Sequence, residues 1–459
     1  MPSYPRDTAN TGLTALGLDA SARVLIVGAG KTGLSVARFL RRHGIEPAVA
    51  DSRENPPGLA ELRETLPDVA VFLGGFDQGA FLAATHLVVS PGVALEEPAL
   101  QRALGAGVPV LGDLDLFAAT VQAPVIAITG ANGKSTVTTL VGLMAQADGR
   151  KVRVGGNLGT PMLDLLDAEA ELYVLELSSF QLERAGALRC RAATVLNISP
   201  DHLDRYPDLQ AYVAVKQRIF AHAEIGVLNA DDPLVAAMAA PVGERRWFSL
   251  KDDASAEFAP QWVEGAEWLA IRGKPLLPVA DVRLQGRHNL ANALAAMALA
   301  DAAGILPEAI AVALRQFRGL DHRMQFVAEI GGVMWVNDSK ATNVGACIAA
   351  LQGLPGKAVL IAGGDGKGAD FSMLAEVASE KVRAAVLMGR DAHFLEQVLG
   401  PVVTTVRVPN MKQAVEVARR LAEAGDTVLL APACASLDQY RDYQERGRVF
   451  VEAVKGLLP

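Results

Sequence analysis

The feature of this sequence that most constrains its fold is a unit that recurs along the whole chain. Each copy has a short apolar run rich in β-branched residues, then a Gly-rich turn, then an Ala/Leu-rich helical pattern. Copies begin at 24–30, 125–133, 172–179, 358–366 and 428–436. Strands that are almost wholly apolar and alternate with helices are typical of parallel sheets covered on both faces. The sequence therefore predicts an α/β protein.

Chain length and two changes of pattern indicate several domains. The chain has 459 residues, which is more than one compact core usually holds. One boundary is expected near 112–123, and another near 317–323, where an Ala-rich helix ends. The segment 245–283 holds three of the four tryptophans among scattered charges. It predicts short antiparallel strands inserted before the next helix.

Composition argues against several classes of protein. The net charge of −8 disfavours broad nucleic-acid binding, because a phosphate polymer needs a basic surface. The three cysteines lie far apart and form no CxxC pair, so neither a zinc site nor a disulfide framework is expected. The N-terminus shows no signal peptide, and the most apolar stretch, 290–306, contains Asn292 and Asp301. We therefore expect a cytoplasmic protein without membrane insertion.

A phosphate-binding loop is the strongest functional signal. Residues 128–136 (ITGANGKST) follow an apolar strand and precede a helical pattern, a context in which backbone N–H groups bind phosphate. In such a loop Lys134 neutralises phosphate charge and Ser135 can ligate Mg²⁺. The loop is shorter than the general GxxxxGK[ST] pattern, since Ile128 stands where that pattern has its first glycine. The alternative is a glycine turn with a solvated lysine.

A second glycine pattern, GxGxxG, opens the chain's first domain at Gly28, Gly30 and Gly33. Asp51 ends the next strand, where a dinucleotide-binding domain places the acid that binds ribose. The physical requirement is only a phosphate at a helix N-terminus, which a UDP-sugar meets as well as NAD does. The turn at 90–93 extends the carboxyl edge of the same sheet, and such edges bind ligands. A structural turn without a ligand is the alternative.

Two further residues in the middle of the chain, Glu176 and His202, are candidates for chemistry, whereas Lys216 is not selected by its local pattern. Glu176 ends a strand beside the phosphate loop, a position from which a carboxylate can hold the Mg²⁺ of a nucleotide. His202 follows a strand that begins near 193 and is expected to neighbour the strand of Glu176; a surface histidine is the alternative. Lys216 lies in a helical run with one apolar face, and its helical phase predicts a solvated side chain.

Together these motifs resemble the Mur ligase superfamily, in order and over the whole chain. The C-terminal segments resemble the members that add D-glutamate, whereas folylpolyglutamate synthetases and ligases for other amino acids differ at 337–343. Tyr440 and Tyr443 stand where those members often carry phenylalanine. The segments that carry the resemblance are GANGKST (130–136), GGNLGTP (155–161), LELSSFQLE (175–183), NISPDHLDRYP (197–207), LQGRHNLANALAA (284–296), GLDHR (319–323), NDSKATN (337–343), AGGDGKGADF (362–371) and PACASLDQYRDYQERG (432–447).

The resemblance implies three domains and a two-step reaction. A Rossmann-like domain over 1–112 would bind a UDP-linked substrate, and a central domain over 113–319, with a parallel or mixed sheet, would bind ATP and two Mg²⁺ ions. A dinucleotide-fold-like domain over 320–459 would bind D-glutamate. The carboxylate of UDP-N-acetylmuramoyl-L-alanine would attack the γ-phosphate of ATP to give an acyl phosphate. The amine of D-glutamate would then displace phosphate, a step of peptidoglycan precursor synthesis.

The resemblance also assigns residues to each part of this reaction, with Lys216 carbamylated so that it becomes a carboxylate-like metal ligand. The residues implied in catalysis are Lys134, Glu176, His202, Lys216 and Arg323. ATP would contact Gly130, Asn132, Gly133, Lys134, Ser135, Thr136, Asn289, Asn292, Arg323 and Asp338, and the metal ions would contact Ser135, Glu176, His202 and Lys216. The UDP-linked substrate would contact Gly30, Lys31, Thr32, Gly33, Asp51, Ser52, Arg53, Ser90, Gly92 and Asn157, and D-glutamate would contact His202, Lys340, Thr342, Lys367, Ser436, Leu437 and Tyr443.

Rival functions stay open at this point, and each has a simple discriminating assay. A nicotinamide dehydrogenase would use Gly28–Gly33 and Asp51, and hydride transfer would reveal it. A non-catalytic nucleotide switch would release no phosphate when an amino acid is added. A folylpolyglutamate-type or other Mur-type ligase would take a different acceptor. We expect a monomer that acts on small molecules.

Overall fold

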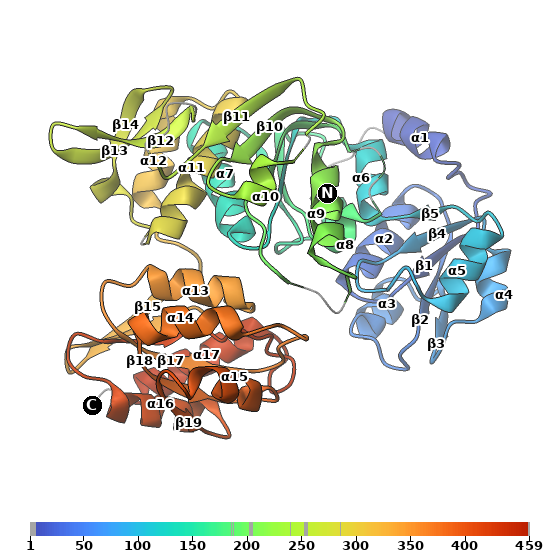
Figure 1. The fold of residues 1–459 in the computed structure, drawn as a ribbon. Coiled ribbons are helices and arrows are strands. Elements are labelled where there is room, and N and C mark those ends of the chain that lie inside the picture. Colours follow the sequence, from blue (N-terminus) through green and yellow to red (C-terminus); the bar gives the residue numbers. More distant parts are fainter. Residues whose placement is uncertain are drawn as a thin grey trace.

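The computed structural model arranges the chain as three α/β units, each built around one sheet (Figure 1). The first unit holds β1–β5, the central unit β6–β14 and the C-terminal unit β15–β20. These strands lie within the predicted domain ranges 1–112, 113–319 and 320–459, while the boundaries themselves stay a prediction. The described residues are 6–184, 186, 188–201, 205–238, 240–251, 256–284 and 286–457.

The first unit is a parallel sheet with helices on both faces, as the apolar strands predict. Its strand order is β3-β2-β1-β4-β5, so the loops after β1, β2 and β4 meet at one edge. Val24 and Ile26 pack with α2 and α3 on one face, while Leu25 and Val27 pack with α4 and α5 on the other. The elements are β1 (Val24–Val27), α2 (Lys31–Arg42), β2 (Pro47–Asp51), α3 (Leu59–Thr65), β3 (Ala70–Leu73), α4 (Gln78–Ala83), β4 (His86–Val89), α5 (Pro98–Gly105) and β5 (Val110–Leu111), preceded by α1 (Arg6–Ala15).

The central unit has a sheet in the order β14-β13-β12-β11-β10-β9-β6-β8-β7. Helices α7, α11 and α12 cover one face, and α6 and α8 lie in the core on the other. The elements are α6 (Asp113–Thr120), β6 (Val125–Thr129), α7 (Lys134–Ala147), β7 (Val152–Gly156), η1 (Met162–Leu165), β8 (Leu172–Glu176), α8 (Ser179–Leu182), β9 (Cys190–Val195), α9 (Leu209–Gln217), η2 (Arg218–Phe220), β10 (Ala223–Asn229), α10 (Pro233–Ala236), β11 (Glu244–Phe248), β12 (Phe258–Val263), β13 (Ala266–Ile271), β14 (Lys274–Pro278), η3 (Val279–Asp281), α11 (Arg287–Ala302) and α12 (Pro307–Gln316).

Two predictions about this sheet were wrong in part. The strand before His202, β9, does not neighbour β8, because β6 pairs with both and lies between them. In the Trp-rich segment only β12, β13 and β14 are antiparallel. Strand β11 runs parallel to β10 and extends the main sheet. The local sequence pattern predicts that a strand is present, whereas the strands that it pairs with depend on how the crossover connections pack.

The C-terminal unit repeats the doubly covered arrangement. Its order is β15-β16-β20-β17-β18-β19, parallel except for the β15–β16 pair. Helices α13, α14 and α15 share one core, and α16 and α17 share the core on the other face. The elements are β15 (Gln325–Ile330), β16 (Val333–Asn337), α13 (Val344–Gln352), β17 (Ala358–Ala362), α14 (Ser372–Lys381), β18 (Val382–Leu387), α15 (Ala392–Leu399), β19 (Thr404–Arg407), α16 (Met411–Leu421), β20 (Thr427–Leu430) and α17 (Tyr443–Lys455).

The three units are joined differently. The first and central units share one apolar core, in which α2 contacts η1 and α1 contacts α6. The C-terminal unit approaches the phosphate loop through polar contacts, among them Arg323 with Ser135, Lys367 with Asp201 and Asn343 with Asn132 and Asp201. Among the described residues, no helix has both the length and the apolarity needed to cross a membrane.

Candidate active site

The phosphate loop follows β6 and ends where α7 begins, at Lys134. Gly130 and Gly133 have φ angles of 152° and 82°, where a side chain would strain the backbone. Gly133 also has no room, because an added Cβ would lie 2.3 Å from Oδ1 of Asn292. The Lys134 ammonium donates to the carbonyl oxygens of Gly130 at 2.9 Å and Ala131 at 2.8 Å. The loop thus combines a cation with a helix N-terminus, as a phosphate site requires.

A polar cluster surrounds the first turn of α7. Ser135 Oγ donates to Glu176 Oε2 at 2.5 Å, and the Arg323 guanidinium donates to Ser135 Oγ at 2.6 Å. Asn157 Nδ2 donates to the other oxygen of Glu176 at 2.8 Å. Burial by itself would raise the pKa of Glu176, but the charge of Lys134 and the bonds from Ser135 and Asn157 outweigh it and lower the pKa. Glu176 is therefore an ionised carboxylate beside the loop.

Lys216 lies under the phosphate loop, so the prediction of a solvated side chain was wrong. Its side chain is buried, and Nζ lies 2.9 Å from the Gly130 carbonyl oxygen and 3.3 Å from Thr129 Oγ1. Burial and the charge of Lys134 lower the pKa of Lys216 well below its ordinary value. The prediction misapplied the helical phase: Lys216 lies one turn after Tyr212, on the face of α9 that is buried.

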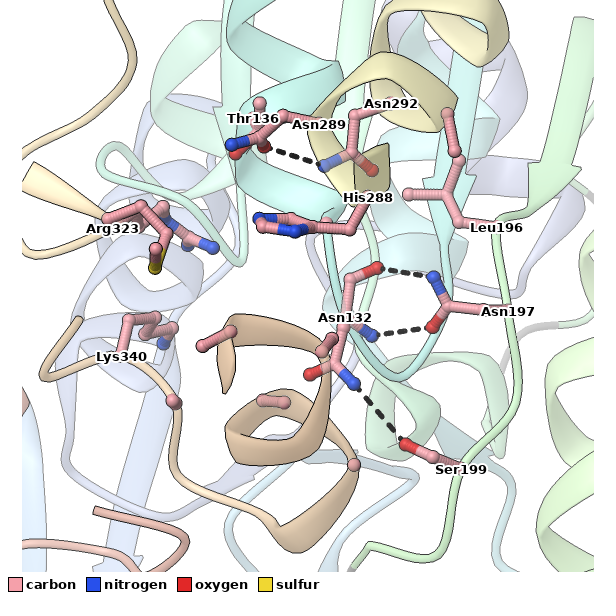
Figure 2. Close-up of a pocket in the computed structure, with 18 of the residues that line it drawn as sticks. Asn132, Thr136, Leu196, Asn197, Ser199, His288, Asn289, Asn292, Arg323 and Lys340 are labelled. Atoms are coloured by element: carbon pink, nitrogen blue, oxygen red, sulfur yellow. Dashed lines mark hydrogen bonds between the residues drawn. The ribbon is translucent and has the colours of Figure 1, made fainter. Parts of the chain in front are cut away.

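A cavity of about 330 Å³, the loop cavity, opens between the phosphate loop, the start of α11 and the C-terminal unit (Figure 2). Asn292 Nδ2 donates to Asn289 Oδ1 at 3.1 Å on its upper side. The volume of the cavity lies within the range of about 300–1,000 Å³ that is usual for small-molecule sites. The predicted ATP-binding residues that line it are Asn132, Gly133, Thr136, Asn289, Asn292, Arg323 and Asp338.

Two titratable groups from the C-terminal unit enter the wall of the loop cavity. Burial raises the pKa of Asp338 to about 7, although Arg323 opposes this shift. Burial, together with the charges of Arg323 and Lys134, lowers the pKa of Lys340 to about 7. Lys340 Nζ lies 3.9 Å from the ring centroid of Tyr443, a cation–π contact.

A second cavity of about 800 Å³, the edge cavity, extends from the carboxyl edge of the first sheet to Ser135 and Glu176. At its far end, Asp51 accepts hydrogen bonds from the Ala29 N–H and the Arg53 Nε, both at 2.8 Å. Burial by itself would raise the pKa of Asp51, but the bonds from Arg53 and Ala29 lower it to about 2. The predicted UDP-binding residues that line it are Gly30, Lys31, Thr32, Asp51, Ser52, Arg53, Ser90, Gly92 and Asn157.

Comparison with known proteins gives relatives over the full length. Residues 22–112 match "Mur ligase MurD-like, N-terminal domain", 128–300 match "Mur ligase middle domain" and 322–434 match "Mur ligase, glutamate ligase domain". The UDP-N-acetylmuramoylalanine--D-glutamate ligase of Methylococcus capsulatus is 63% identical over 97% of both chains. The chain belongs to the Mur ligase family. The enzyme of the same name from Nitrosococcus oceani is 53% identical to this chain, over 95% of this chain and 97% of that one.

A solved structure supports the same fold for this Mur ligase. The pseudomurein peptide ligase type C of Methanothermus fervidus superposes with a TM-score of 0.61, covering 95% of this chain and all of that one. Its sequence identity is 19%, so this likeness concerns the fold alone.

The residues predicted to bind D-glutamate in this Mur ligase are only partly brought together. Lys340 and Tyr443 meet in the wall of the edge cavity, and Lys340 also lines the loop cavity. Thr342, Ser436 and Leu437 line neither cavity. Ser436 is buried, and Leu437 is 70% exposed. The roles of these three residues stay a prediction.

Lys367 and His202 were both assigned to D-glutamate as well. Lys367 reaches across to the central unit, where its ammonium lies 2.6 Å from Oδ1 of Asp201. His202, which was also predicted as a catalytic residue and metal ligand, lies outside the described residues.

Gly33 is the one residue of the predicted UDP-binding set that does not line the edge cavity. An added Cβ at Gly33 would lie 1.9 Å from the Gly28 carbonyl oxygen. This glycine therefore allows α2 to pack closely on the turn after β1, which is the role of the third glycine in such a pattern.

Sequence reasoning missed three residues around the loop cavity. Asn197 Oδ1 accepts a hydrogen bond from the Asn132 N–H at 2.8 Å, and Asn197 Nδ2 donates to the Asn132 carbonyl oxygen at 3.1 Å. Asn343 Nδ2 donates to Asn132 Oδ1 at 3.2 Å. His288 lines the cavity, and burial lowers its pKa. All three lie inside motifs quoted above, so their segments were identified while their roles were not.

The described residues provide oxygen ligands for a hard cation beside the loop. In the described part of the chain, no three or more His, Cys, Asp or Glu side chains are grouped so that they could hold a metal ion by themselves. The hydroxyl of Ser135 and the carboxylate of Glu176 nevertheless lie together, and Mg²⁺ is commonly held by one or two protein oxygens plus substrate phosphates. This pair therefore fits a magnesium ion bound jointly with a nucleotide.

Proposed function

We propose that this Mur ligase uses ATP to join D-glutamate to UDP-N-acetylmuramoyl-L-alanine, releasing ADP and phosphate, as a step of peptidoglycan precursor synthesis. The supporting observation is that the loop cavity and the edge cavity share a wall residue beside the phosphate loop. Lys340 lines both cavities, and Ser135 and Glu176 stand where the edge cavity reaches the phosphate loop. The names of the relatives given above favour this ligase over hydride transfer and over a non-catalytic nucleotide switch.

The two cavities fit the order of the reaction. ATP would lie in the loop cavity with its γ-phosphate toward Ser135. The UDP moiety would lie against Asp51 and Arg53, so that the muramoyl-alanine carboxylate points along the edge cavity to the same place. Its oxygen attacks the γ-phosphorus, the bond to ADP breaks, and an acyl phosphate forms. The D-glutamate amine then attacks the acyl carbon, and phosphate leaves with the bonding electrons.

Cations are the main catalytic requirement, because the first step brings several anionic oxygens together. Lys134 lies over the loop, and Arg323 reaches the same turn of α7 from the C-terminal unit. Lys340 adds a third nitrogen at the junction of the cavities. Because Arg323 and Lys340 belong to the C-terminal unit, the docked position of that unit would complete the site.

We propose that Ser135 and Glu176 hold one Mg²⁺ and that His202 and a modified Lys216 hold a second. Magnesium would neutralise charge on the phosphate oxygens. The modification is carbamylation, in which the neutral amine of Lys216 attacks CO₂ and loses a proton. Its burial and lowered pKa favour the neutral amine that this reaction needs. The carbamate would replace a buried neutral amine with an anionic oxygen ligand.

D-glutamate would be held mainly by residues of the C-terminal unit. Its two carboxylates need fixed cationic or hydroxyl donors. Lys340 and Lys367 would supply cations, Thr342 and Ser436 would supply hydroxyls, and Tyr443 with Leu437 would flank the substrate. In this structure Lys367 binds the Asp201 carboxylate, which indicates that its ammonium can reach a carboxylate at the unit boundary.

The test is phosphate release from purified protein with ATP, Mg²⁺ and UDP-N-acetylmuramoyl-L-alanine, in parallel with D-glutamate or L-glutamate. We expect release that depends on the D-isomer. Release with neither isomer, or equal release with both, would overturn the proposed third substrate. Hydride transfer to or from a nicotinamide would overturn the ligase assignment itself.

A further inference from the structure

Arg446 is a buried cation that forms no ion pair with any described acidic residue. It lies in the first turn of α17, and its side chain is among the largest that are fully buried. No ion pair joins it to any described residue; the acceptors of its guanidinium are oxygens of Ser339 and Cys434. A buried charge is costly, and an apolar side chain of similar volume often stabilises a core better. Its presence therefore calls for a role other than packing.

The guanidinium of Arg446 links two loops of the C-terminal unit. Its Nε donates to Ser339 Oγ at 3.0 Å and its Nη2 to the Ser339 carbonyl oxygen at 2.8 Å. Its Nη1 donates to the Cys434 carbonyl oxygen at 3.1 Å. Ser339 immediately precedes Lys340 in the loop after β16, and Cys434 lies two residues before Ser436 in the loop after β20.

Neighbouring contacts hold α17 against the same loops. Ser339 Oγ donates to the Tyr443 carbonyl oxygen at 2.8 Å, so the loop after β16 is tied to the helix start as well. At Gly447 an added Cβ would lie 2.3 Å from Nδ1 of His322. The absence of a side chain at Gly447 therefore allows α17 to pack closely against His322, in the segment before β15. Ala433 has a φ of 57°, a conformation that an alanine holds only when surrounding contacts enforce it.

We infer that Arg446 is a positioning residue for the amino-acid substrate: it fixes the Lys340 loop and the Ser436 loop relative to each other through Ser339 and Cys434. This inference rests on the proposed function, because it supposes that both loops contact D-glutamate. A planar guanidinium suits the task, since its N–H groups point in fixed directions and reach three acceptors at once. A lysine at this position would carry the charge, but its single ammonium group could not reproduce the planar set of N–H donors.

The experiment compares Arg446→Lys and Arg446→Met with the matched control Arg441→Lys. The Arg441 side chain is 77% exposed and pairs with Glu445. We expect Arg446→Lys to raise the KM for D-glutamate by at least roughly tenfold, the size expected for the loss of charge-assisted bonds. The KM for ATP should stay close to wild type. Arg446→Met should have a larger effect of the same kind, and Arg441→Lys should have none.

Hydrogen–deuterium exchange gives a second readout that needs no turnover. In Arg446→Lys, exchange should become faster in 338–343 and 433–438 and stay unchanged in the phosphate loop. Unchanged exchange and an unchanged KM for D-glutamate would overturn the inference, and so would an equal rise of every KM with a lower melting temperature. If Arg446→Met does not fold, the lysine variant decides. Wild-type protein that releases no phosphate with D-glutamate would refute the proposed function, whereas the exchange data would still decide whether Arg446 holds the two loops.

Discussion

Replacing Gly133 by alanine is a sharp test of the phosphate loop. The residue has a φ of 82°, and an alanine Cβ would lie 2.3 Å from Oδ1 and 3.1 Å from Cγ of Asn292. Asn292 is itself buried and bonded to Asn289, so it cannot swing away without losing that bond. The substitution therefore strains the loop backbone and pushes α11 and the loop apart.

The expected magnitude follows from two separate costs. A left-handed backbone costs an alanine about 1–2 kcal/mol, and overpacking a tight contact costs about 1–3 kcal/mol. If these two costs together make the loop conformation that binds nucleotide about 2 kcal/mol less favourable, the Kd for ATP rises roughly 30-fold. Gly149 is the matched control, because its φ is 81° and nothing lies within 4 Å of an added Cβ. Gly149→Ala carries the backbone cost without the collision.

The assay is calorimetric titration of ATP with Mg²⁺, alongside denaturant unfolding. We expect Gly133→Ala to weaken ATP binding while Gly149→Ala leaves it unchanged. The double variant Gly133→Ala/Asn292→Ala should lose less free energy of ATP binding than the sum of the losses in the two single variants, because the smaller side chain removes the collision. Equal ATP affinities for the two glycine variants, or losses that simply add, would refute the steric reasoning.

Three further predictions concern titratable groups and the contact between units. The contribution of Asp338 to stability should fall as the pH rises from about 4 to about 7, because burial raises its pKa and the folded state keeps a proton which the unfolded chain has released. Compared with Asp338→Asn, wild type should therefore lose more free energy of unfolding across that range, and equal slopes for the two proteins would contradict this. Lys216→Ala should lose activity, and short carboxylic acids should restore part of it, while no restoration would leave the carbamate without support. Lys367→Ala should raise the KM for D-glutamate several-fold, whereas substitution of the exposed Lys412 should not; an unchanged KM would remove Lys367 from the substrate's surroundings.

Structural features that depend on a short stretch of sequence were predictable. The α/β class follows from apolar strands alternating with helical patterns, and each of the three sheets contains strands at the predicted positions. The loop conformation around Lys134 and Ser135 was predictable because it is local: one strand end, a few glycines and one helix start. Glu176 could be identified because the carboxyl end of a neighbouring parallel strand lies beside that loop. The strand pairing was less predictable, since β6 lies between β8 and β9.

Other features of the site were decided by tertiary structure. Lys216 was predicted to be exposed because lysine is usually a surface residue, and the packing of α9 under the loop makes it a buried amine. Arg323 and Lys340 reach the loop from another unit, which no periodicity predicts. Arg446 lies on the inward side of α17, and only the folded unit brings Ser339 and Cys434 within reach of one guanidinium. The physical reason is the range of the forces involved. Turns and apolar periodicity involve residues a few positions apart and leave a trace in the sequence, whereas burial, pKa shifts and contacts between units arise only after distant segments have packed together.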